Sequence, residues 1–269
     1  MTDLRGRRLA GNVFVWTLGG ESVASSYGSN GGAIIGRDAV LVVDPLIAPS
    51  YARLVEEAVR KETSLPIRFV VVTHHHTDHA LGAGYFASAG AEVLTHAACR
   101  DRMAAEHAGL IASRRSQSDL ASLFEDAEAY EPSRTFRDET TLDLGGTVVR
   151  VLHPGHNHTP GDAVVHLPGE SVVFCGDLVS NGYHVNYEDA AFGKLEGGLN
   201  LLRSLGARTY VPGHGTPGGP EILDAQSRYH AAIAQARREA DADKAADWIR
   251  SRFPDHLLEI VTTSSFSRE

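Results

Sequence analysis

The segment most informative about the fold is IRFVVVTHHHTDH, from Ile67 to His79. Its first part, Ile67 to Thr73, is a nearly continuous apolar run, which is typical of a strand buried on both faces. Directly after it come four possible metal ligands within six residues: His74, His76, Asp78 and His79. The first two, one residue apart in an extended loop, can project to the same side and bind one ion, and the last two can reach a second. The stretch therefore predicts a metal centre at a strand end.

Three later segments also place a possible ligand on a tight, glycine-containing turn after a predicted strand. They are Gly155 to Asp162 (GHNHTPGD), Gly176-Asp177, and Pro212 to Gly215 (PGHG). Loops at strand ends carry ligands and active-site residues in α/β folds. Each segment alone carries little information. Their order after the histidine cluster indicates one site assembled from distant parts of the chain.

Short β-branched runs and amphipathic stretches alternate along the rest of the chain. Strands are predicted at 13–16, 33–35, 40–43, 67–73, 92–95, 140–144, 147–152, 163–167, 171–175 and 209–211. Helices are predicted at 49–61, 80–89, 195–205 and 221–253, and two more within 96–129, separated near 113–118. Gly31-Gly32, Arg37-Asp38 and Gly145-Gly146 are expected to form turns. The rhythm predicts an α/β fold with helices outside a strand core.

Composition excludes several classes of protein. The chain has 269 residues, 42% hydrophobic content and a net charge of −9. This acidic balance makes nucleic acid a poor partner, and we expect Arg5, Arg7 and Arg8 to lie in a solvated, frayed terminus. Two distant cysteines, Cys99 and Cys175, do not form a disulfide framework. Since no apolar stretch is membrane-sized and no signal peptide is recognisable, we expect a cytoplasmic protein without a membrane partner.

The ligand pattern is where a family resemblance emerges. His74-X-His76-X-Asp78-His79, followed by His158, Asp177 and His214, resembles the signature of the metallo-β-lactamase superfamily. The resemblance extends from about Asn12 to Pro217. It implies a four-layer αββα sandwich with metals in a cleft at one edge of the two sheets. On this basis residues 10–220 are expected to form the catalytic domain, and residues 221–269 a helical C-terminal extension packed on it.

The resemblance also implies a ligand set for two zinc ions. His74, His76 and His158 would hold the first, Asp78, His79 and His214 the second, and Asp177 would bridge them. This set is similar to that of glyoxalase II and the lactonases, whereas B1 β-lactamases have a cysteine in place of Asp177 and B3 enzymes lack the bridging aspartate.

Two neighbouring histidines compete with this set. His156 is an alternative to His158, which we favour because the family places this ligand before a turn like Thr159-Pro160-Gly161. His75 should point away from its neighbours along an extended loop, and it is expected to pack or to support a ligand.

The implied activity is metal-dependent hydrolysis of a small molecule. A hydroxide bridging two cations would cleave an ester, thioester, lactone or amide, because the ions lower the pKa of water from about 15.7 towards about 7. Asp78 and Asp177 would orient this nucleophile. Within the superfamily the chain is most similar to the glyoxalase II-like branch. Tyr183, His184 and Asn186 are expected to contact the substrate, and the C-terminal helices to cap the cleft or form a homodimer contact.

The same residue pattern is compatible with other functions. The same histidines could bind one Fe²⁺, with positions left for O₂ and a thiol-derived substrate, as in persulfide dioxygenase-like enzymes of the same fold. A phosphodiesterase or nuclease is disfavoured by the acidic charge. A non-catalytic metal-binding protein is disfavoured by the intact ligand set.

Overall fold

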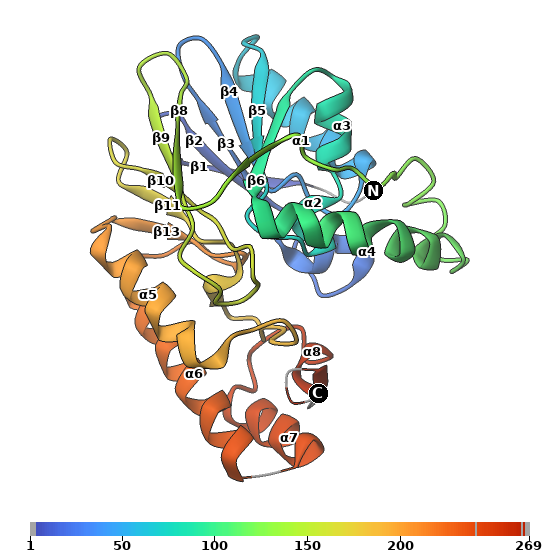
Figure 1. Cartoon of the computed structure of the whole chain (residues 1–269), viewed down its shortest axis with the longest axis vertical. Helices are drawn as coiled ribbons and strands as arrows, with labels where there is room; N and C mark the ends of the chain where they lie inside the picture. Colours follow the sequence, from blue (N-terminus) through green and yellow to red (C-terminus); the bar gives the residue numbers. More distant parts are fainter. Residues whose placement is uncertain (1–3, 240, 265, 267–269) are drawn as a thin grey trace.

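Two sheets form the centre of the molecule. The computed structural model describes residues 4–239, 241–264 and 266, and within them a seven-stranded and a five-stranded sheet pack face to face, with helices on both outer faces (Figure 1). The first sheet has the order β1 (Arg5–Ala10), β2 (Val13–Thr17), β3 (Asn30–Ile35), β4 (Val40–Val43), β5 (Ile67–Val71), β6 (Glu92–His96), β7 (Arg134–Phe136). The second has the order β13 (Thr209–Val211), β11 (Val172–Phe174), β10 (Val164–Leu167), β9 (Val148–Leu152), β8 (Glu139–Asp143). The arrangement confirms the predicted αββα sandwich.

Parallel pairing gathers loops at one edge of the first sheet. Strands β4, β5, β6 and β7 run parallel, and parallel neighbours need crossover connections such as helices. Helix α1 (Pro49–Glu62) connects β4 to β5, and α2 (Thr77–Ala80) and α3 (Ala83–Ser88) connect β5 to β6. The carboxyl ends of β4 and β5 therefore meet at the same edge, where the histidine cluster begins.

A second parallel pair does the same in the other sheet. Strand β11 pairs in parallel with β13. The chain segment that connects them contains four elements: η2 (Gly176–Leu178), β12 (Ser180–Asn181), η3 (Phe192–Lys194) and α5 (Leu195–Ser204). Beyond β13, β14 (His214–Gly215) pairs with β12. Asp177 and His214 thus follow the neighbouring strands β11 and β13, each three residues after the strand ends.

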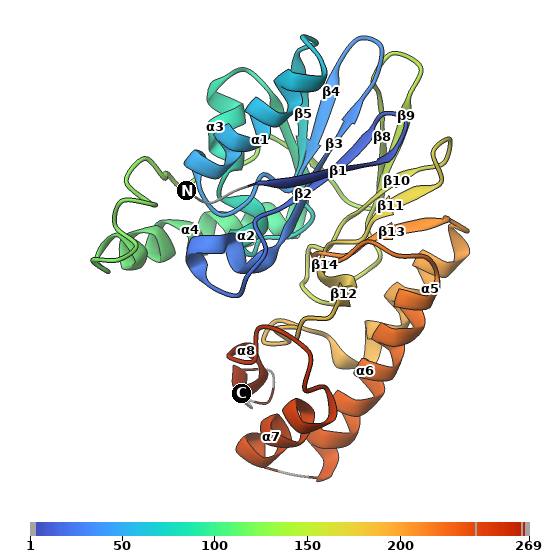
Figure 2. The same ribbon diagram turned by 180° about the vertical axis from the view of Figure 1, so that it is seen from behind.

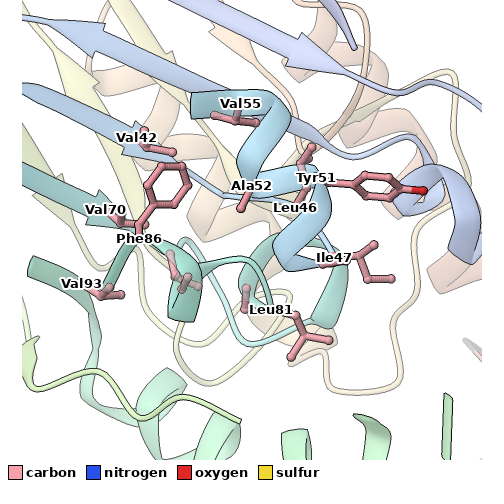
Figure 3. Close-up of a cluster of buried hydrophobic side chains, with 14 of the residues drawn as sticks. Val42, Leu46, Ile47, Tyr51, Ala52, Val55, Val70, Leu81, Phe86 and Val93 are labelled. Carbon is pink, nitrogen blue, oxygen red and sulfur yellow. The ribbon is translucent and has the colours of Figure 1, made fainter. Parts of the chain in front are cut away.

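Alternating side chains in the strands fill two layers of core. In β4, Leu41 and Val43 join the core between the sheets, whereas Val40 and Val42 join the core beneath the helices, because successive side chains point to opposite faces. Figure 3 shows the helix-side core, where Phe86 of α3 packs near Val42 and Val70. A third core lies between the second sheet and the helices α5 and α6 (Glu221–Glu239).

The C-terminal helices form a cluster of their own. Figure 2 shows α7 (Ala242–Arg252) and α8 (Val261–Ser264) at the end of α6 that lies away from the sheets. Tyr229 and Ile233 of α6 pack with Ile249 of α7 and with Tyr187 of the loop before α5. None of the described helices is long and apolar enough to span a bilayer. The domain boundary at residue 220 stays a prediction.

Two local predictions for the first sheet were wrong. The arginine-rich segment expected to be frayed is strand β1, paired antiparallel with β2. Gly31 and Gly32 lie inside β3 and form no turn. A Cβ at Gly32 would lie 2.3 Å from the Phe174 ring, so the glycine permits close approach of the sheets.

The predicted pair of helices within 96–129 is also wrong. A single helix, α4, runs from Ala97 to Arg115, and turns follow it. Arg115 donates hydrogen bonds to the carbonyl groups of Phe124, Glu125 and Ala127, so these turns fold back on the helix end. Strand β7 had no sequence signal strong enough to predict it.

Candidate metal centre

The histidine cluster begins at the third residue after β5 and is anchored by the carboxylate of Asp44, the residue directly after β4. Asp44 accepts hydrogen bonds from the Thr73 amide (2.8 Å), the Thr73 hydroxyl (2.8 Å) and Nδ1 of His79 (3.0 Å). The chain then turns into α2, with His76 at its N-cap position. Asp44 thereby holds both ends of the ligand loop.

Seven predicted ligands lie together in two groups. His74, His76, His158 and Asp177 form the first, and Asp78, His79 and His214 the second. Within each group the candidate donor atoms all lie within 4.8 Å of one another. In the first, Nε2 of His158 lies 3.1 Å from Nδ1 of His76. In the second, Oδ2 of Asp78 lies 3.3 Å from Nε2 of His214 and 3.4 Å from Nε2 of His79.

Asp177 lies between the two groups. Its Oδ2 is 3.6 Å from Nε2 of His158 and 3.9 Å from Nε2 of His74, both in the first group. The same carboxylate approaches the second group, with Oδ2 3.4 Å from Nε2 of His214 and Oδ1 3.2 Å from Nε2 of His79. One carboxylate is thus within reach of donors from both groups.

The residues fit a metal centre. Nε2 of His74 and Oδ1 of Asp177 are buried without a hydrogen-bond partner among the described residues, although buried polar atoms are normally paired. Burial lowers the pKa of His74, and it lowers the pKa of His158 to about 3. Both imidazoles are therefore neutral, as ligation requires. Imidazole nitrogens and carboxylate oxygens are standard zinc ligands.

The second group has the opposite electrostatic balance. Burial lowers the pKa of His214, but the carboxylates of Asp177 and Asp78 outweigh it and raise the pKa to about 9. The same carboxylates raise the pKa of His79 against the effect of burial. The pocket therefore attracts positive charge, which a bound cation would supply in place of the protons.

Hydrogen bonds orient most of the ligand imidazoles. The Thr73 hydroxyl gives its single proton to Asp44, so it accepts from Nδ1 of His74 (3.1 Å). Nδ1 of His214 donates to the Tyr27 carbonyl group (3.1 Å). These contacts, and the one between His79 and Asp44, leave Nε2 of each ring free for a metal.

The loop that carries His158 is shaped by Asp162. Its carboxylate accepts hydrogen bonds from the backbone amides of Asn157, His158 and Thr159, at 3.1, 2.8 and 2.9 Å. His156 lies outside both donor groups, and its Nε2 donates to the Asp189 carbonyl group (2.8 Å). His158 lies in the first donor group and His156 does not, and the role of His158 as a ligand stays a prediction.

The predicted substrate residues are spread apart. Tyr183 adjoins the ligands, with its ring centroid 5.6 Å from that of His214. His184 is buried beneath the C-terminal helices, where its Nδ1 is 2.8 Å from the Tyr229 hydroxyl group. Asn186 accepts a hydrogen bond from the Glu188 amide. Contact with substrate stays a prediction for all three.

Sequence reasoning missed several residues that support the ligands. Asp44 and Asp162 had a usable signal, since Asp44 directly follows the predicted strand at 40–43 and Asp162 ends the segment 155–162 singled out above. Asp189 and Arg102 had none. Oδ2 of Asp189 is 3.2 Å from Nε2 of His76 and 3.4 Å from Nε2 of His75, and Arg102 donates to Oδ1 (2.6 Å).

Comparison with known families agrees with this geometry. Residues 27–214 match the family model of the metallo-beta-lactamase superfamily, and this range contains all seven ligand candidates. The chain belongs to this superfamily. Superfamily members are generally metal-dependent hydrolases, and the donor groups described above are consistent with that chemistry.

Solved structures share the superfamily fold. VMB-1 is 19% identical with a TM-score of 0.69, and the match covers 87% of this chain and 99% of that one. A metallo-beta-lactamase from Pontibacter korlensis is 22% identical with a TM-score of 0.66, over 84% and 97% of the two chains. TMB-1 is 18% identical with a TM-score of 0.70, over 87% and 100%. At these identities the likeness concerns the fold alone.

Proposed function

We propose that this superfamily member is a dinuclear zinc hydrolase that cleaves an ester, thioester, lactone or amide bond in a small molecule. The observation that carries the proposal is the position of Asp177, whose carboxylate lies within 4 Å of ring nitrogens from both donor groups. A carboxylate placed in this way can bridge two cations. A single-ion site would use only one of the two groups.

The ligand residues would have different roles in hydrolysis. Zinc ions bound here would lower the pKa of water and polarise the bond to be cleaved. Asp177 lies within 4 Å of ring nitrogens from both groups, and Asp78 within 4 Å of ring nitrogens from the second group. We therefore expect these two carboxylates to orient a water molecule and to accept its proton. His76 is 20% exposed, whereas the other ligand imidazoles are buried. Substrate would therefore approach from the side of His76.

The bridging aspartate supports placement in the glyoxalase II-like branch. The residue directly after Gly176 is an aspartate and not the cysteine expected of a B1 β-lactamase. Oxygen and nitrogen donors alone favour zinc or iron over metals that need a thiolate. We therefore expect thioesters, lactones and other activated esters to be better substrates than β-lactams.

Metal analysis combined with activity assays tests the proposal. We expect about two zinc ions per chain in the purified protein, and hydrolysis of at least one member of a panel of thioesters, lactones and β-lactams. Substitution Asp177→Ala should lower the zinc content and reduce hydrolysis by about 100-fold or more, since it removes the shared ligand. Asp224→Ala is the matched control, because Asp224 is 64% exposed and its recorded ion pair is with Arg203.

One outcome would replace the proposal. About one iron per chain, no hydrolysis across the panel, and oxygen uptake that depends on a thiol would instead identify a mononuclear iron dioxygenase.

A further inference from the structure

Asp189 lies where three parts of the molecule meet, yet it has no place in the predicted ligand set. It belongs to the loop between β12 and α5. Its side chain contacts the histidine cluster after β5 and Arg102 of α4, and its carbonyl group contacts the loop that carries His158. The side chain is only 17% exposed.

The first contact determines which nitrogen His76 offers. A carboxylate only accepts hydrogen bonds, so Nε2 of His76 must carry the proton that points at Oδ2 of Asp189, 3.2 Å away. The neutral ring then has its lone pair on Nδ1. Nδ1 is the atom that faces Nε2 of His158, at 3.1 Å, inside the first donor group. Asp189 therefore selects the tautomer that this group needs.

The second contact holds the carboxylate in place. Arg102 donates to Oδ1 at 2.6 Å, while the histidines lie on the side of Oδ2. Arg102 is also paired with Glu106 of the same helix. The guanidinium group already supplies the positive charge that this carboxylate needs, so His75, His76 and Asp189 are poorly suited to bind a further cation. Helix α4 thus fixes Asp189, and Asp189 fixes His76.

The third contact extends the effect to the other ligand loop. The Asp189 carbonyl group accepts from Nε2 of His156 (2.8 Å), two residues before His158. Nearby, the Ala191 amide donates to the Asn157 carbonyl group (2.9 Å). One short segment therefore supports both His76 and His158, although these ligands are 82 positions apart in the sequence.

We propose that Asp189, held by Arg102, is the positioning residue for the first donor group, and that it acts by fixing the tautomer of His76 and the place of the His158 loop. The inference rests on the proposed metal centre. It predicts an effect confined to one of the two ion sites, because no donor of the second group contacts Asp189 in the recorded hydrogen bonds and ion pairs of the described residues.

Zinc titration in competition with a chromophoric chelator tests this on the full chain. Loss of a partner that orients a ligand typically costs about 10- to 100-fold in metal affinity. We expect Asp189→Ala to raise the zinc dissociation constant of the first donor group by about this factor. The zinc dissociation constant of the second donor group should stay within about threefold of the wild-type value. Asp189→Asn keeps an acceptor oxygen and the shape of the side chain, so its loss should be smaller. Asp224→Asn is the matched control and should bind zinc as the wild type does.

A spectroscopic signature separates positioning from general damage. In zinc-loaded protein labelled with ¹⁵N-histidine, His76 should show a protonated Nε2 and a metal-bound Nδ1, assigned by comparison with a His76→Gln variant. Asp189→Asn should shift the Nε2 proton signal while the metal-free variant unfolds at the wild-type temperature. Arg102→Lys should retain most of the zinc affinity, whereas Arg102→Met should reproduce the defect of Asp189→Asn.

The outcomes against the inference are distinct from failure of the proposed function. Unchanged zinc affinity in both Asp189 variants, equal weakening of both sites, or an unchanged His76 signal would each overturn the positioning role. If the wild type and Asp224→Asn also fail to bind zinc, the proposed metal centre is itself wrong, and the inference falls with it. If Asp189→Ala does not fold, the isosteric Asp189→Asn variant decides.

Discussion

At the scale of single residues, the candidate centre depends on groups outside the predicted ligand set. Asp44, Thr73, the Tyr27 carbonyl group and Asp189 each accept a hydrogen bond from a ligand imidazole. In every case the bond leaves the other ring nitrogen facing the donor groups. Such partners set ligand orientation and basicity, so they contribute to affinity as the ligands themselves do.

Gly213 provides a test of how tightly Asp177 is enclosed. A Cβ at this position would lie 1.8 Å from Oδ1 of Asp177, so Gly213→Ala should displace the carboxylate. We expect a lower zinc content and hydrolysis reduced by about tenfold or more, measured by metal analysis and steady-state kinetics. The control is Gly197→Ala in α5, where a Cβ meets nothing within 4 Å. It should keep the zinc content and stabilise the helix by about 0.5–1 kcal/mol. Wild-type zinc content in Gly213→Ala would refute the close approach.

At the scale of helices and strands, the site depends on crossover connections. Helix α1 returns the chain so that β5 lies parallel to β4, which places Asp44 beside Thr73 at one edge of the sheet. Helix α3 packs on the same face and helps to hold β5 and β6 in place. The position of the ligand loop therefore depends on the packing of the core beneath these helices.

Phe86 of α3 tests that dependence. Its ring is buried among side chains of the first sheet and α1 (Figure 3). Phe86→Ala should lower the free energy of unfolding by about 3–5 kcal/mol, because it removes a buried ring and leaves a cavity. Urea denaturation monitored by circular dichroism measures the change. Leu110→Ala, at a position 39% exposed, is the control and should change stability by less than about 1 kcal/mol. Equal losses in the two variants would contradict the assignment of the core.

At the scale of the whole molecule, the C-terminal helices support the loop that carries Asp189. Tyr187, two residues before Asp189, packs against Tyr229 and His230 of α6. Gln226 donates to both the Tyr187 hydroxyl group and Nε2 of His230, each at 3.0 Å. The extension is thus connected to the ligand set through this loop, which gives it a structural role without any contact with an ion.

The buried His230 of α6 should make the free energy of unfolding fall in acid. Burial lowers the pKa of His230 to about 4, below the value of about 6.5 expected in the unfolded chain. Between these values the unfolded state binds more protons than the native state, so stability falls as the pH drops from about 6.5 to about 4. We expect His230 to account for a loss of roughly 3 kcal/mol over this range.

Urea denaturation of the metal-free protein at a series of pH values measures the loss, since metal release then plays no part. His230→Leu should show a flatter dependence below about pH 6.5 and the same slope as the wild type at about pH 8 to 9, where His230 is neutral in both states. The same steep dependence in both proteins below pH 6.5 would exclude His230 as a source of the acid sensitivity.

Features with a local signal could be predicted from the amino-acid sequence. The strand before His74, the hairpin at Gly145-Gly146 and helix α1 follow from hydrophobic period and turn chemistry. The αββα class came from the resemblance to the metallo-β-lactamase superfamily, which rests on the closely spaced ligand motif. The seven ligand candidates also came from the sequence, because each lies on a short turn after a strand. That they bind two zinc ions stays a prediction.

Which distant groups meet depends on how the layers of the fold pack together. The edge strand β1 forms because β2 offers it unpaired backbone groups. Gly32 lies in β3, paired with β2 and β4, and its missing side chain leaves room for the Phe174 ring of the other sheet. Asp189 lies against His76 because a loop between β12 and α5 is held by α4 and by the C-terminal helices. Such contacts leave no periodic trace in the sequence, since they are set by the packing of whole layers and not by neighbouring residues.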